Sequence, residues 1–247
     1  MEHVLEYPHY GEALGNAASV IRSNAAAAGL AAPVPTCPGW SVTDLVSHVG
    51  CVYRWASASV RRVAAPAAEA ALAEARGSVD LLDWFDDGLV DILNALGNAP
   101  ADLDVPFLLG DAPAPRVAWA RRQAHESTIH AVDAMAARLG RVPVASELWF
   151  SEELATDGLD ELLTGWVPRV MATAEGSIGV VTDGGAAWVV GPEAGSVRRV
   201  LAAEGMAAAT TFTGSATSLY IGLWNRGDEI AASARSTLEA WRQRVRV

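Results

Sequence analysis

Glu126 and His130 stand four residues apart in a segment whose pattern predicts a helix, 115–139. Side chains at this spacing lie one turn apart on the same helix face, so the carboxylate and the imidazole can reach one point. Asp133 follows Glu126 by seven residues and falls on that face as well. Helical bundles often bind a metal ion with a carboxylate and an imidazole from one helix and a further ligand from another. The spacing therefore predicts part of a divalent-metal site.

His125 is excluded from this site by its spacing. It stands five residues before His130, whereas the zinc-protease motif HExxH needs histidines four residues apart. Five residues turn a helix by about 140° net, so the two rings point in different directions. The segment therefore does not predict a zinc protease.

His48 is the candidate for the third ligand. It lies in a second predicted helix among the apolar residues Leu45, Val49 and Val52. A histidine on an apolar face is commonly a hydrogen-bonded core residue, and a Glu–His pair at helical spacing is commonly an ordinary surface pair. From spacing alone, these two alternatives stay open beside a site formed by His48, Glu126 and His130.

Several helices must position these side chains. Ser41, followed by Asp44, is typical of a helix start with a capping box. Pro115 and Gly140 are typical of the first and last positions of the helix that carries Glu126. The predicted helices cover 10–30, a stretch from Ser41 to Trp55, 78–97, 115–139 and 150–173, with a Pro-containing loop over 98–114 and a kink at Pro168.

The hydrophobic period changes after about residue 176. Residues 178–182 and 186–190 flank Asp183-Gly184-Gly185 and predict a β-hairpin. Further strands are expected at 196–201 and 207–213, and helices at 215–224 and 229–245. The fold class is therefore two-domain α+β, with an up-down four-helix bundle over 1–175 and a small α+β domain over 176–247.

Composition restricts the partners. The net charge of −11 disfavours binding to nucleic acid, and no apolar run is long enough to span a membrane. The residues Met1 to Val4 do not resemble the start of a signal peptide, and two cysteines, Cys37 and Cys51, suit a reducing compartment. We therefore expect a cytoplasmic protein, and both cysteines are interpreted as small buried apolar residues.

Two sequence blocks resemble a known family. The run VPTCPGWSVTDLVSHVG over 34–50 and the run AHESTIHAVDA over 124–134 are similar to the two metal-binding blocks of the mycothiol-dependent maleylpyruvate isomerase family, within the DinB-like metalloprotein superfamily. Residues 157–163 and 214–226 resemble two later blocks of the same family, in the same order. The resemblance thus extends over nearly the whole chain.

The resemblance implies a function and a set of site residues. The fold would be a four-helix bundle with a C-terminal α+β domain, and the metal ligands would be His48, Glu126 and His130. An arginine that the family's isomerase requires would correspond to Arg226, although the family commonly has glycine where this chain has Asn225. The thiol partner would be mycothiol, a cysteine-containing sugar thiol of actinobacteria.

The chemistry follows from the ligand set. Two imidazoles and one carboxylate leave an open position on an ion such as Zn²⁺, as in catalytic sites. A thiol bound there would be a thiolate that attacks a small electrophilic substrate, which gives a mycothiol-dependent S-transferase or isomerase. Two alternatives remain: a hydrolase that uses metal-bound water, and a non-catalytic binding protein with the same fold.

Four other residues have expected roles. Asp133 is expected to orient His130, and Arg226 to hold a substrate carboxylate or else to close a helix at the surface. Trp40 is expected to anchor its loop on the bundle, and Cys37 to pack.

Overall fold

The computed structural model describes residues 4–170, 176–191, 196–200 and 207–245. The chain divides into two compact units. The bundle unit comprises Glu6–Leu108 and Pro113–Pro143, and the C-terminal unit comprises Met1–Leu5, Leu109–Ala112 and Val144–Val247. Among the described residues, no helix is both long enough and apolar enough to cross a membrane.

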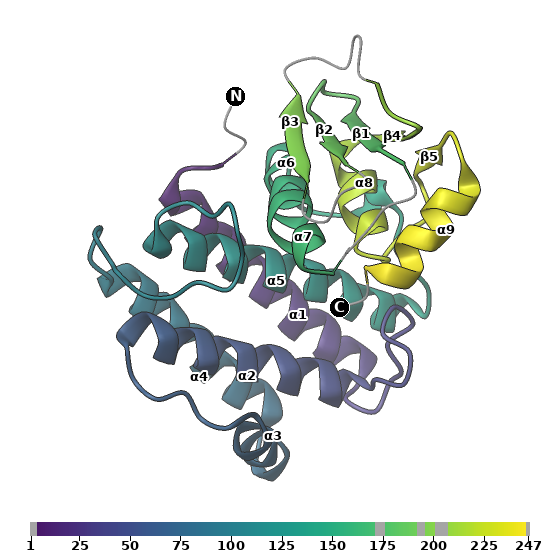
Figure 1. Cartoon of the computed structure of the whole chain (residues 1–247). Coiled ribbons are helices and arrows are strands. Elements are labelled where there is room, and N and C mark those ends of the chain that lie inside the picture. The colour runs from purple at the N-terminus through teal and green to yellow at the C-terminus, as the bar shows by residue number, and fades with distance from the viewer. Residues whose placement is uncertain (1–3, 171–175, 192–195, 201–206, 246–247) are drawn as a thin grey trace. The chain divides into compact units, whose positions relative to one another are not determined.

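The bundle unit is helical throughout (Figure 1). Its helices are α1 (Tyr7–Ala28), α2 (Val42–Arg61), α3 (Ala68–Gly77), α4 (Leu81–Asn98) and α5 (Pro115–Leu139). Four of them match the predicted helices, and the two-domain α+β class is confirmed. The fifth, α3, was not predicted, because its Ala-rich sequence has no large apolar residue at helical spacing other than Leu72.

The ends of α2 and α5 form as their sequences predict. The Ser41 side chain accepts a hydrogen bond from the Asp44 backbone N–H, and the Asp44 carboxylate accepts one from the Ser41 backbone N–H. Pro115 lies in the first turn of α5, and Gly140 ends that helix in the left-handed conformation. These caps fix where the two helices begin and end, and therefore the rotation at which they present their side chains.

Helix α5 lies at the centre of the bundle unit. It packs along α1 and against α2, and α2 packs in turn against α4 (Figure 1). Small residues make the contacts of α5 close, since Ala124, Ala131 and Ala134 are completely buried. Almost every side chain from Ala118 to Ala137 is buried, including polar ones. A polar group on α5 must therefore find a partner inside the protein.

The C-terminal unit combines helices with one sheet. Its elements are η1 (Ala145–Glu147), α6 (Glu152–Glu161), η2 (Leu162–Trp166), α7 (Val167–Val170), β1 (Ile178–Thr182), β2 (Ala187–Val190), β3 (Val197–Val200), β4 (Thr210–Gly214), α8 (Ala216–Leu223), β5 (Ala231–Ala232) and α9 (Arg235–Arg244). The predicted hairpin, both later strands and both later helices are present, but β5 occupies the first residues of the last predicted helix. The predicted strand residue 201 lies outside the described residues.

The sheet has the strand order β3-β2-β1-β4-β5. Strands β1 and β2 form the predicted antiparallel hairpin, with Val180 opposite Trp188. Gly185 adopts a positive φ of 87° in the turn, which glycine allows without strain. Strand β4 pairs with β1 in parallel, a pairing that the sequence pattern left open.

Asp160 links α6 to the sheet within the C-terminal unit. Its buried carboxylate accepts hydrogen bonds from the Trp188 indole N–H at 2.9 Å and from Arg199 Nε at 2.6 Å. Arg199 also binds Asp111 at 2.7 Å, and the two carboxylates raise the pKa of the guanidinium. Burying a carboxylate is unfavourable unless such partners surround it, so this cluster fixes the sheet against the helix.

The predicted helix 150–173 changes its backbone hydrogen-bond pattern part-way along its length. The helical path runs from Glu152 to Val170, but residues 162–166 form a π-helical turn just before Pro168. Proline has no backbone N–H and cannot donate the usual helical hydrogen bond, and the wider π-helical turn accommodates this missing bond. Residues 171–173 lie outside the described residues. This segment packs on α8 and lies in the longest part of the C-terminal unit, Val144–Val247. The domain boundary near residue 175 stays a prediction.

Asp91 on α4 holds α2 in place through Arg61, whose Nη1 lies 2.8 Å from Asp91 Oδ1. Hydrogen bonding from Arg61 lowers the pKa of Asp91. A lowered folded-state pKa stabilises the protein above the unfolded pKa of about 3.9 and loses this effect as the pH falls through the folded value.

We therefore expect Asp91→Asn to reduce the free energy of unfolding at pH 7 by about 0.5–1 kcal/mol, since the pair is partly exposed. The difference from wild type should be smaller at pH 3, because the stabilisation is lost as the pH falls toward the lowered folded pKa of Asp91. Urea unfolding at both pH values measures it, with Asp87→Asn, an exposed neighbour on the same helix, as the control. An equal loss at both pH values would contradict the electrostatic origin.

Candidate metal centre

His48, Glu126 and His130 come together in the bundle unit. Glu126 Oε1 lies 3.3 Å from His48 Nε2 and 3.2 Å from His130 Nε2. One ligand atom from each residue lies within 4.8 Å of the other two. The pair on α5 is one turn apart as the sequence predicts, and α2 brings His48 to it from 78 residues away.

The spacing of these atoms suits a small divalent ion. Ligand bonds of about 2.0–2.1 Å at tetrahedral angles place neighbouring donor atoms roughly 3.3 Å apart. The two Glu126–His separations, 3.3 and 3.2 Å, match this value. Two imidazoles and a carboxylate are also a usual donor set for Zn²⁺, with a fourth position open. The residues therefore fit a metal ion that can accept one further ligand.

Asp133 fixes the orientation of the His130 ring. Its Oδ2 atom lies 2.9 Å from His130 Nδ1, so the ring nitrogen that faces Asp133 is the donor and Nε2 points toward Glu126. The Cys37 thiol donates to the same carboxylate oxygen at 3.3 Å. Asp133 is completely buried. A carboxylate behind a ligating histidine is a common arrangement around protein-bound metals, because it fixes the ring and its tautomer.

Arg122 completes the surroundings of Glu126. Its Nη2 atom lies 3.0 Å from Glu126 Oε2, which leaves Oε1 for the two histidines. Burial alone would raise the pKa of Glu126, but hydrogen bonds from His130 and His48 outweigh it and hold the pKa well below its usual range. Burial disfavours charge on His130 too, yet its bonds to Asp133 and Glu126 raise its pKa to about 9. The site therefore holds a carboxylate and attracts positive charge.

Trp40 packs against both histidines. Its ring is nearly parallel to that of His130, at 15° and 6.3 Å between centroids, and lies 5.1 Å from that of His48. These contacts agree with the prediction that Trp40 anchors its loop on the bundle. The surface that Trp40 covers is formed by the two histidines of the site. The His48 side chain remains 38% exposed, against 6% for His130, so the site is reached from the side of His48.

The remaining candidate residues lie elsewhere. His125 is buried and packs edge-on against Tyr10 of α1, which agrees with its exclusion. Arg226 belongs to the C-terminal unit, where it is buried and its Nη1 donates to the Trp224 carbonyl at 2.8 Å. Asn225 precedes it in the left-handed conformation, φ 63°, which suits a position where the family commonly has glycine. Cys51 is half-buried, and burial raises the pKa of its thiol.

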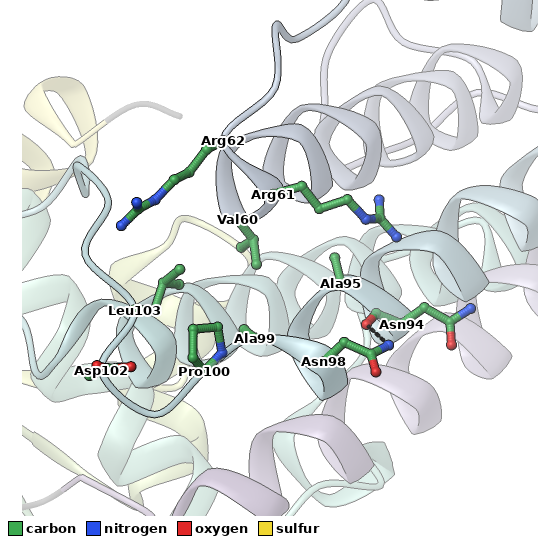
Figure 2. Close-up of a pocket in the computed structure, with 10 residues that line it drawn as sticks. All are labelled: Val60, Arg61, Arg62, Asn94, Ala95, Asn98, Ala99, Pro100, Asp102 and Leu103. Atoms are coloured by element: carbon green, nitrogen blue, oxygen red, sulfur yellow. Dashed lines mark hydrogen bonds between the residues drawn. The ribbon is translucent and has the colours of Figure 1, made fainter.

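A separate cleft in the bundle unit has a volume of about 570 Å³ (Figure 2). It lies where α2 ends, and Val60 on its wall is 12 residues beyond His48, which corresponds to about 18 Å along a helix. Arg61 and Arg62 point to opposite sides of it (Figure 2). Arg61 is bound to Asp91, and Arg62 donates to the Asp104 carbonyl. The described lining of this cleft includes no histidine or cysteine. The cleft is therefore a weaker candidate for a catalytic site than the metal centre.

The family of the chain follows from its N-terminal part. Residues 13–135 match the family model described as the mycothiol maleylpyruvate isomerase N-terminal domain, and this range includes all three site residues. Residues 13–135 belong to this family. The membership confirms the resemblance seen in the two sequence blocks and the expectation of an enzyme family.

Solved structures with the same fold agree with the family. The chain is similar to the crystal structure of the mycothiol-dependent maleylpyruvate isomerase and to that of a histidine-to-alanine mutant of this enzyme. Each matches with a TM-score of 0.63 and 15% identity, over 93% of both chains. At this identity the likeness establishes the fold over nearly the whole length. No curated protein matches the chain by sequence.

Sequence reasoning missed two contacts of the site. Arg122 stands one turn before Glu126, a spacing that could have indicated an ion pair on the same face. Cys37 was expected only to pack, and its bond to Asp133 spans 96 residues, which no local pattern encodes. The expected role of Asp133 agrees with its contact to His130.

Proposed function

We propose that this protein is a divalent-metal-dependent and mycothiol-dependent enzyme of the S-transferase or isomerase type. The observation that carries the proposal is the meeting of His48, Glu126 and His130 in a domain of the mycothiol maleylpyruvate isomerase family. The partners would be a small thiol and a small electrophile, in the cytoplasm, where thiols such as Cys37 and Cys51 stay reduced.

In this proposal, His48, Glu126 and His130 hold the ion, with Zn²⁺ as the first candidate. A divalent ion there supplies the positive charge that keeps a bound thiol in its thiolate form. Asp133 holds the ring of His130 at the required angle, and Arg122 holds Glu126. Trp40 shields one side of both rings from water, which strengthens electrostatic interactions within the site.

Arg226 is proposed to bind the carboxylate of the substrate. A guanidinium can bind a carboxylate through two parallel hydrogen bonds, and maleylpyruvate, the substrate named for the family, carries carboxylates. The support in this chain is that Arg226 is buried directly after the left-handed Asn225, so its backbone is fixed. A buried guanidinium that reaches a carboxylate would position the electrophile for attack.

Metal binding tests the ligand set. We expect His48→Ala to lose most bound Zn²⁺ and Asp133→Asn to bind it about 10–100-fold more weakly, because the first removes a ligand and the second its support. The helical content should remain, since the core consists of aliphatic and aromatic side chains that do not depend on a metal ion. Metal analysis, competition titration and circular dichroism measure these effects. His9→Ala, an exposed histidine on α1, is the control, and equal metal content in His48→Ala and wild type would remove His48 from the site.

Thiol binding tests the reaction class. Mycothiol added to the Co²⁺-substituted protein should produce a sulfur-to-metal charge-transfer band. Binding should also release up to one proton per site near neutral pH, since a free alkyl thiol has a pKa of about 8.5 and is protonated there. Spectroscopy and calorimetry in two buffers of different ionisation enthalpy measure both effects. An unchanged spectrum with no heat would overturn the thiol-dependent function and favour a hydrolase that uses water.

Substrate binding tests Arg226. Arg226→Lys should retain Zn²⁺ and mycothiol, while kcat/KM for maleylpyruvate should fall at least about tenfold, because an ammonium cannot bind a carboxylate through two parallel bonds. Arg242→Lys, in α9 of the same unit, is the control. Unchanged kcat/KM in Arg226→Lys would exclude the proposed role without affecting the metal centre.

A further inference from the structure

Gln123 is a buried amide with no partner. The residue is completely buried on α5, yet neither its Oε1 nor its Nε2 atom has a hydrogen-bond partner in the described part of the chain. Burying such a group without a partner destabilises the folded protein, because the amide loses its hydrogen bonds to water and gains none in exchange. An amide retained at this cost needs an explanation outside the packing of the protein.

The polar side chains at positions 126–128, which follow Gln123 on α5, have partners. The Thr128 hydroxyl donates to the Ala124 carbonyl at 2.7 Å, and the Ser127 hydroxyl bonds to the Tyr53 hydroxyl of α2 at 2.8 Å. Glu126 has three partners, as described above. The Trp119 indole N–H, one turn before Gln123, is also buried without a partner. Unsatisfied groups therefore occur at two successive turns, 119 and 123, just before the metal centre.

Helix geometry places Gln123 on the side of α5 that faces α2. Its neighbours four residues away on either side are Trp119 and Ser127, and both contact α2: Trp119 packs on Trp55 at 5.0 Å between centroids, and Ser127 bonds to Tyr53. Glu126 is three residues further along, on the adjoining face. Gln123 thus precedes the proposed metal ligand Glu126 by three residues, a rise of about 4.5 Å along the helix axis.

We propose that Gln123 binds the polar part of the thiol whose sulfur occupies the open position of the metal centre, and that Trp119 Nε1 extends this subsite by one turn. The proposal rests on the proposed function. An amide offers both a donor and an acceptor, and an indole offers a donor. The matching ligand is a thiol that carries hydroxyl or amide groups one to two helical turns, about 5–11 Å, from its sulfur. A simple alkyl thiol would bind the metal and leave Gln123 unused.

The test compares two thiols on the metal-loaded protein. Gln123→Met keeps the volume and removes the amide. We expect this variant to bind mycothiol about tenfold more weakly, the size of one hydrogen bond to a buried polar group, and to bind ethanethiol as wild type does. Calorimetry and the Co²⁺ charge-transfer band measure both affinities. The metal-loaded variant without thiol should melt about 2–4 °C higher than wild type, because an unsatisfied buried group has been removed.

Thr128→Val is the matched control, since its hydroxyl lies on the same helix but is used by the protein itself. It should leave both thiol affinities unchanged and should not raise the melting temperature. If Gln123→Met does not fold, Gln123→Leu serves in its place. Equal mycothiol affinity in the variant and wild type overturns the inference, whatever the melting temperature does. Failure of both thiols to bind the wild-type protein would instead overturn the proposed function.

Discussion

The carboxylate of Glu126 is the point on which the candidate site depends. It contacts both other proposed ligands, His48 on α2 and His130 on its own helix, and it is the one among the three that carries a negative charge. Without it, the two imidazole rings, whose centroids lie 4.9 Å apart, would face each other with no negative charge between them. The carboxylate also lies at the position where a divalent cation would be most strongly attracted. The rest of the bundle serves to keep this one group ionised and in place.

Keeping a buried carboxylate ionised requires partners on every side. Arg122 takes one oxygen, the histidines take the other, and Asp133 accepts from the far side of His130. A single helix carries most of the network, since α5 holds Arg122, Glu126, His130 and Asp133 at successive spacings of four, four and three residues. Capping by Pro115 and Gly140 fixes that helix, and its buried alanines let it lie close to its neighbours. The rigid helix therefore holds the side chains around Glu126 at fixed positions.

The C-terminal unit is organised by a different buried carboxylate. Asp160 binds Trp188 of β2 and Arg199 of β3, which joins a helix to two strands that are not adjacent to it in sequence. In both units, therefore, a buried acid with several donors sets the arrangement of the elements around it. Breaking one partner of such a cluster is more disruptive than losing a surface pair, because the remaining charge is left without compensation.

The sequence by itself determined what depends on local spacing. The 3.6-residue period placed Glu126, His130 and Asp133 on one face and excluded His125, and caps at Ser41 and Gly140 located helix ends. Two short blocks were enough to indicate the family, and the change of period predicted the hairpin. Contacts between distant segments were decided only by tertiary packing: His48 against Glu126, Cys37 against Asp133, the parallel pairing of β1 with β4, and the isolation of Gln123. Helix and strand periods encode which face a side chain occupies, but the partner on that face depends on how the elements pack, and no period in the sequence carries that information.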